Sequence, residues 1–112
     1  MPICLYLLMR DIPQFKAEFF KTLGHPLRIR ALELLSEGAH SVSELLEQVD
    51  AEQPHLSQQL GVLRRAGFVT TRRDGTTVIY RLADERIGDL LAVSKEILVD
   101  MLTATRDELR LS

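Results

Sequence analysis

Apolar side chains recur every three or four residues through the first third of the chain. Between residues 12 and 23 the apolar positions include Ile12, Phe15, Phe19, Phe20 and Leu23. This spacing predicts a helix with one apolar side. Pro26 can open a second helix, because the first turn needs no backbone donor at that position. The second helix is strongly apolar up to Gly38, so we expect it to lie at the centre of the core.

Two further helices are predicted close together, separated by a turn at residues 50–52. Ser41 and Glu44 match a capping box at the start of the first, although Ser43 is an alternative cap. Pro54 opens the second at its first position, and Gly67 ends it. We call the helix over residues 53–66 the reading helix. Its buried side is predicted to consist of Leu56, Leu60 and Leu63.

After Gly67 the apolar period changes from three or four residues to two. Residues 68–73 and 76–82 are rich in β-branched and aromatic side chains, which favours two strands. Asp74-Gly75 between them predicts a tight hairpin turn. Residues 40–42 could form a further short extended segment, and Asp84 can cap a long last helix that reaches residue 109.

The predicted fold is mainly α with a small β-hairpin, in the order of a winged helix-turn-helix. One domain is expected over residues 1–112. Its parts are an N-terminal arm at 1–11, helices at 12–38, a helix-turn-helix at 41–67, a wing hairpin at 68–82 and a dimerisation helix at 84–109.

Charge is distributed unevenly along the chain. The formal net charge is −2, yet residues 53–82 hold five arginines and one acid, a net charge of +4. A basic third within an acidic chain is typical of a surface that binds a polyanion, although a solvated basic patch is the plain alternative.

The expected DNA contacts come from the polar side of the reading helix and from the hairpin tip. Glutamine can pair with adenine through two hydrogen bonds, serine can contact bases or phosphates, and arginine can bind phosphate. Ordinary solvated helix and hairpin positions are the alternative. The predicted DNA-binding residues are Gln53, His55, Ser57, Gln58, Gln59, Arg64, Arg65, Arg72, Arg73 and Thr76.

The first and last helices carry more apolar surface than a small monomer needs. Pairing across a two-fold axis would bury this surface and present two reading helices one turn of DNA apart. An intramolecular bundle is the alternative. The predicted dimer contacts are Phe15, Phe19, Leu90, Leu91, Leu98, Met101 and Leu102.

Four stretches together resemble the ArsR/SmtB family of bacterial transcriptional repressors. They are LGHPLRIRAL at 23–32, SVSEL at 41–45, LSQQLGVLRRAGFV at 56–69, and RRDG at 72–75 leading to YRL at 80–82. The resemblance implies a homodimer joined through its first and last helices, a double-stranded operator of two-fold symmetry, and release of DNA when an inducer binds. Residues 54–55 and 58–59 depart from the family's usual residues, so base preference is not inherited.

The family's familiar metal sites are incomplete in this sequence. The helix starting near Glu44 reads ELLEQ, without the Cys-x-Cys of the thiolate type. Asp84 and Asp100 stand in two of the four places of the last-helix type, while Arg86 and Ile97 occupy the histidine places. Neither arginine nor isoleucine binds a metal. A transition metal at a non-standard site is an alternative, with Asp84, Asp100 and Cys4 as the candidate ligands.

Other features narrow the class of protein. The sequence contains no catalytic motif, so we expect no enzyme. A single cysteine fits a reducing compartment, and the apolar run at 3–9 is too short to span a bilayer, so a cytoplasmic protein that does not enter membranes is expected. The run could be a packing arm, or the natural start could be Met9. A winged helix that binds proteins rather than DNA, and a dimerisation module of a larger enzyme, remain alternatives, as does regulation by a partner protein.

Overall fold

The structure, a computed structural model, describes residues 9–111. The predicted arm, apart from residues 9–11, and Cys4 therefore lie outside the described residues. The elements are α2 (Ile12–Thr22), α3 (Pro26–Ser36), β1 (His40–Ser41), α4 (Val42–Leu46), α5 (Gln53–Arg65), β2 (Val69–Asp74), β3 (Thr77–Leu82) and α6 (Arg86–Leu111). All the helices and both hairpin strands predicted from the pattern are present, and the reading helix is α5.

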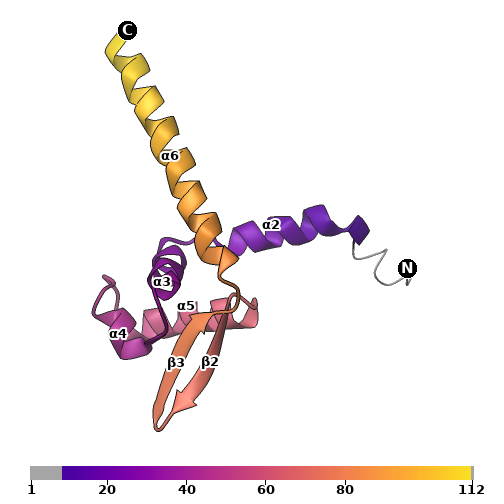
Figure 1. Cartoon of the computed structure of the whole chain (residues 1–112), viewed down its shortest axis with the longest axis vertical. Helices are drawn as coiled ribbons and strands as arrows, with labels where there is room; N and C mark the ends of the chain where they lie inside the picture. The colour runs from indigo at the N-terminus through magenta and orange to yellow at the C-terminus, as the bar shows by residue number, and fades with distance from the viewer. Residues whose placement is uncertain (1–8, 112) are drawn as a thin grey trace.

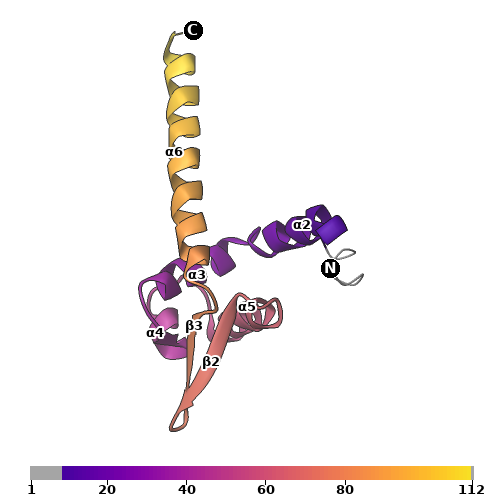
Figure 2. The same cartoon turned by 45° about the vertical axis from the view of Figure 1, so that its right-hand side comes forward.

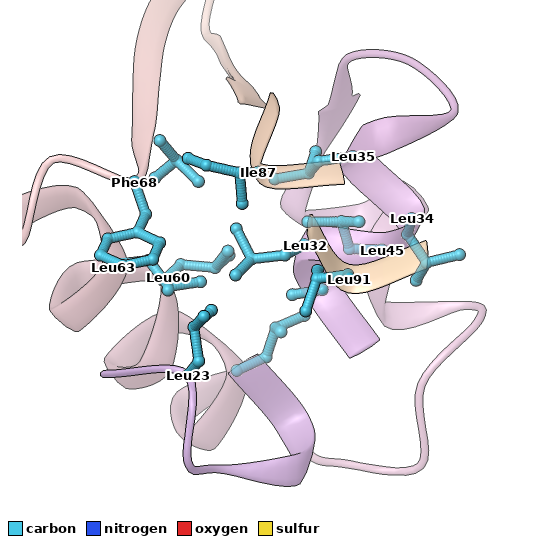
Figure 3. Packing of buried hydrophobic residues seen from close by; sticks show 13 residues of the cluster. Leu23, Leu32, Leu34, Leu35, Leu45, Leu60, Leu63, Phe68, Ile87 and Leu91 are labelled. Atoms are coloured by element: carbon cyan, nitrogen blue, oxygen red, sulfur yellow. The ribbon is translucent and has the colours of Figure 1, made fainter. Parts of the chain in front are cut away.

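The core forms around α3, as the apolar sequence of that helix predicts. Leu32 lies between Leu60 and Leu63 of α5 on one side and Leu91 of α6 on the other (Figure 3). Leu32, Leu60 and Leu63 have no exposed side-chain surface, and Leu45 brings α4 into the same cluster. Deleting such a leucine to alanine typically costs about 2–5 kcal/mol, so this cluster holds α5 firmly against α3.

The strands form a three-stranded antiparallel sheet in the order β1-β3-β2. β2 and β3 form the hairpin, which we call the wing, and Asp74 pairs with Thr77. The two-residue loop is therefore Gly75-Thr76, and the prediction of Asp74-Gly75 was wrong by one residue. Gly75 has φ +66°, while Thr76 has a negative φ, the pattern of a type II′ turn with glycine first. Two-residue turns of this kind match the twist of the flanking strands.

The helix starts confirm most of the capping expectations. Ser41 accepts from the Glu44 amide at 3.2 Å, and the Glu44 carboxylate accepts from the Ser41 amide at 3.0 Å, so Ser41 is the cap of α4. α5 begins at Gln53, so Pro54 is its second residue and not its first. α4 ends at Leu46, which leaves Val49 in the turn before α5, where its side chain is half-buried. Short caps and turns thus set the spacing between α4 and α5.

α2 and α6 extend away from this core in different directions (Figure 1). The Cα radius of gyration is 17.5 Å, whereas a compact domain of this length has about 13 Å. Gly88 lets α6 leave the core close to α3, because a Cβ at that position would lie 2.8 Å from Ser36 Cβ. No helix among residues 9–111 has the length and apolar character needed to cross a membrane.

Candidate nucleic-acid interface

One side of α5 is anchored in the core and the opposite side faces solvent. Leu56, Leu60 and Leu63 are fully buried. The exposed predicted contacts on this helix are Gln53, His55, Ser57, Gln58, Arg64 and Arg65. A helix held by leucines on one side and polar on the other has the form needed to enter the major groove.

Gly61 lies in the middle of the exposed side and is covered by Arg65. Arg65 Nη1 lies 3.2 Å from where a Cβ at Gly61 would be. The glycine therefore gives room to the arginine side chain of the next turn, which lies along the outer surface of α5. The guanidinium of Arg65 therefore lies over position 61, on the side of the helix that also carries position 58.

Gln59 does not lie on the exposed side, and this part of the prediction was wrong. Its side chain is 9% exposed, and its Oε1 accepts from Arg28 Nε at 2.8 Å. Position 59 lies three residues after Leu56 and four before Leu63, so it belongs to the buried stripe of the helix. A glutamine in that stripe needs an internal partner, and this was the available signal. Arg28 was not singled out from the sequence at all.

The arginines at the tip of the wing are exposed to solvent. Arg72 and Arg73 are both exposed, as is Thr76 in the loop. Adjacent strand residues point to opposite faces, so the two guanidinium groups flank the ribbon. Among residues 9–111, none of the arginines of α5 or of the wing forms an ion pair with an acid. Their positive charge is thus available to an external anion.

α5 and the wing lie on the same part of the molecule. α5 packs against β2, and the wing projects away from the C-terminal end of α6 in both views (Figures 1 and 2). Arg81 Nε lies 3.5 Å from Thr70 Oγ1 across the hairpin, at the limit for a hydrogen bond. The exposed polar side of α5 and the arginines of the wing together form what we call the basic surface, consisting of Gln53, His55, Ser57, Gln58, Arg64, Arg65, Arg72, Arg73 and Thr76.

Two histidines come together at the starts of α3 and α5. The rings of His25 and His55 have centroids 5.9 Å apart. His25 Nδ1 accepts from the Leu27 amide at 3.2 Å, which caps α3. A neutral ring that accepts at Nδ1 carries its proton on Nε2, which leaves no lone pair for a metal ion. Within residues 9–111 no group of three or more His, Cys, Asp or Glu residues is arranged to hold a metal.

The side chain of Asp84 binds the first residue of α6, Arg86. It accepts from the Arg86 amide at 2.9 Å and pairs with the Arg86 guanidinium at 2.7 Å. The Arg86 hydrogen bonds lower the pKa of Asp84 to about 2. Asp100 lies 16 residues further along the chain, about 24 Å away at the helical rise of 1.5 Å per residue. The two carboxylates therefore cannot share a metal within one chain.

The predicted dimer contacts divide into two groups. Leu91 is buried within its own chain at 9% exposure, and Phe19 and Leu90 are half-buried against the same core. Leu91 therefore belongs to the core of the subunit, a correction to the prediction. The contacts that remain exposed are Phe15, Leu98, Met101 and Leu102.

Comparison with known proteins agrees with this architecture. Residues 25–71 match the family model of bacterial regulatory proteins, arsR family. The chain is 57% identical over 91 residues to the uncharacterized HTH-type transcriptional regulator Rv0081 of Mycobacterium tuberculosis, a match that covers 80% of each chain. Its crystal structure superimposes with a TM-score of 0.78 at 55% identity, covering 84% of this chain and 95% of that one.

Two other solved structures extend the comparison. The transcriptional repressor BigR from Xylella fastidiosa has a TM-score of 0.73 at 42% identity, covering 80% of this chain and 91% of that one. A winged helix-turn-helix DNA-binding domain from Mycobacterium bovis, described as homodimeric, has a TM-score of 0.69 at 25% identity and covers 89% of both chains.

Proposed function

The chain belongs to the ArsR family of bacterial regulatory proteins, and from this premise we propose that it is a homodimeric repressor whose α5 and wing bind operator DNA. The observation that carries the proposal is the basic surface: an exposed polar helix side beside a wing whose arginines have no acidic partner among residues 9–111. A dimer of such chains would work in the cytoplasm, where the operator lies.

α5 would supply the base contacts. Its leucine side stays packed on α3 while Ser57 and Gln58 face the groove. A glutamine amide has both a donor and an acceptor, so Gln58 can make two hydrogen bonds to one adenine. Ser57 and His55, nearer the helix start, are placed to reach bases or the adjoining phosphates.

The wing would supply backbone contacts. Arg72 and Arg73 can each bind a phosphate, with Thr76 as a hydroxyl donor at the tip. These contacts release counterions, so they add affinity for every duplex and weaken as salt rises. Arg64 and Arg65 extend the same positive charge along the C-terminal turn of α5.

Dimerisation would place two basic surfaces on one operator. α6 continues the side that carries Leu91 in the core into an exposed apolar stripe of Leu98, Met101 and Leu102. α2 adds the exposed ring of Phe15. The winged helix-turn-helix domain from Mycobacterium bovis, described as homodimeric, has this fold, which supports a two-fold arrangement for this chain. Bound to an operator, such a dimer would block transcription until a signal of unknown chemistry releases it.

The proposal is tested by measuring DNA affinity against salt. Duplexes enriched from a random library by the wild-type protein are compared with unselected duplexes of equal length, from 50 to about 300 mM salt, by fluorescence anisotropy. A repressor should bind the enriched duplex at least about 1,000-fold more tightly, with affinity for both falling steeply as salt rises. A protein-interaction module or a dimerisation module would enrich no duplex and show no such ratio.

A further inference from the structure

α2 is joined to the rest of the chain by few contacts. None of its residues is buried, and its side chains reach the body mainly where the Phe19 ring lies 4.8 Å from that of Phe68. Its last residue, Thr22, offers its carbonyl oxygen to Arg28 Nη1 at 2.9 Å. The position of this helix relative to the core therefore depends on a small number of groups near its C-terminal end.

Arg28 connects three helices through one guanidinium. Its side chain starts from α3 and is half-buried. Nη1 donates to Thr22 of α2, and Nε donates at 2.8 Å to Gln59 Oε1 of α5. Both bonds are short and involve a charged donor, so each is stronger than a bond between neutral groups.

Gln59 can be fixed by this contact because it lies against the core. It occupies the buried stripe of α5 next to Leu60 and is 9% exposed. Its neighbour Gln58 is exposed. The leucines fix which side of α5 is buried, and the Arg28 bond at position 59 adds a directional contact that limits the remaining rotation of the helix and so the direction in which Gln58 points.

We propose that Arg28 is a positioning residue that ties the end of α2 to α5. It thereby fixes the orientation of the base-contacting side of α5 relative to the dimer. The inference rests on the proposed function. Since α2 also carries the exposed Phe15, a movement of α2 in the dimer would reach α5 through Thr22, Arg28 and Gln59.

The geometry separates this role from a direct DNA contact. Both donor nitrogens of Arg28 named above point at protein acceptors. Arginine holds two acceptors at once with its planar fork, whereas the single ammonium of lysine has no such fixed geometry. Arg28→Lys therefore keeps the charge and loses the bridge.

The test compares the wild type with Arg28→Ala, Arg28→Lys, Gln59→Leu, Gln59→Glu and the double variant Arg28→Ala/Gln59→Leu. Affinities for the enriched and the unselected duplexes are measured over the same salt series. Arg28→Ala, Arg28→Lys and Gln59→Leu should each lower the ratio of the two affinities by about tenfold. The double variant should lower the ratio no further than Arg28→Ala alone, because Gln59→Leu removes a bond that Arg28→Ala has already removed. Gln59→Glu keeps an acceptor for Arg28 and should retain most of the ratio.

The salt dependence distinguishes positioning from phosphate binding. A lost phosphate contact reduces the slope of log affinity against log salt by about 0.9. Arg28→Ala should leave that slope unchanged, and its circular dichroism spectrum should match the wild type. Arg30→Ala, which removes an exposed charge from the same helix, should keep the ratio of enriched to unselected affinity. If Arg28→Ala fails to fold, the inference is tested by the affinity ratios of Arg28→Lys, Gln59→Leu and Gln59→Glu.

Several results would overturn the inference. They are an unchanged ratio in Arg28→Lys and Gln59→Leu, additive losses in the double variant, a reduced salt slope in Arg28→Ala, or a ratio lost equally in Gln59→Glu and Gln59→Leu. Failure of the proposed function is a different outcome, because then the wild type itself would enrich no duplex.

Discussion

Two adjacent glutamines of α5 have opposite surroundings, and this difference sets their roles. Gln58 is exposed on the basic surface, while Gln59 is buried and accepts from Arg28. Both were predicted as DNA contacts because both are polar and the buried side of the helix was assigned from its leucines alone. The bond to Arg28 joins residues 31 positions apart, and no local pattern reveals such a partner.

Gln58→Ala and Arg73→Ala should affect DNA binding in different ways. Gln58→Ala should cost about 1–3 kcal/mol of discrimination between enriched and unselected duplexes, because a base contact is lost. Arg73→Ala should weaken both duplexes similarly and lower the salt slope by about 0.9 for each lost phosphate contact. Anisotropy titrations at several salt concentrations measure both quantities. Equal effects of the two variants on unselected DNA would contradict this division of roles.

At the scale of elements, the apolar pattern predicted the helices and the wing well. The leucines at 56, 60 and 63 identified the buried side of α5, and all three are fully buried. The pattern could not place Leu91, because one apolar stripe runs along α6 from the core into its exposed part. It also misplaced the wing loop, since Asp74-Gly75 and Gly75-Thr76 both fit a glycine turn and only the strand register decides between them.

The anchoring of α5 is tested by Leu60→Ala. The side chain has no exposed surface, so its loss should reduce the free energy of unfolding by about 2–5 kcal/mol through transfer and cavity terms. Urea denaturation followed by circular dichroism measures this change. Val62→Ala is the control from the same helix, since Val62 is only half-buried, and it should cost clearly less. Equal losses in the two variants would argue against the observed orientation of α5.

The start of α6 should respond to acid through Asp84. Its pKa in the folded chain is about 2, below the ordinary value of 3.8, so the ionised carboxylate stabilises the fold. This contribution is fully present above about pH 4 and is lost as the pH falls from about 4 to 2. The melting temperature of Asp84→Asn should therefore lie below that of the wild type at pH 7, and the gap should close across that window.

Arg86→Gln provides the matched variant for this measurement, because it removes the group that lowers the pKa most. Its acid transition should move to higher pH than that of the wild type. A gap between Asp84→Asn and the wild type that stays constant from pH 7 to pH 2 would refute the role of the ionised Asp84.

At the scale of the whole molecule, two properties follow from how charge and apolar surface are distributed. Residues 53–82 carry a net charge of +4 in a chain of net charge −2, and this stretch includes α5 and the wing. The large exposed apolar residues are concentrated on the projecting helices and include Ile12, Phe15 and Phe20 on α2, and Leu98, Met101 and Leu102 on α6. Exposed apolar area of this extent usually marks an interface.

Dimerisation is tested by Leu102→Glu on the exposed stripe of α6. A carboxylate buried without a partner at a two-fold interface should weaken self-association by on the order of 100-fold or more. Analytical ultracentrifugation measures this directly. Thr103→Glu introduces the same charge at an exposed position on the side of the helix away from Leu98 and Met101, and should leave the dimer intact. Operator affinity should fall with dimerisation in Leu102→Glu, and an undisturbed dimer in that variant would place the interface elsewhere.

The central claim is that two copies of α5 lie in the major groove of one operator. Methylation interference at guanine N7, an atom of the major groove, tests it on the enriched duplex with the wild-type dimer. The account predicts two clusters of interfering guanines centred about 10–10.5 base pairs, one helical turn, apart. The claim would be contradicted if the protein bound tightly to a duplex with guanines throughout and methylation interfered at none of them.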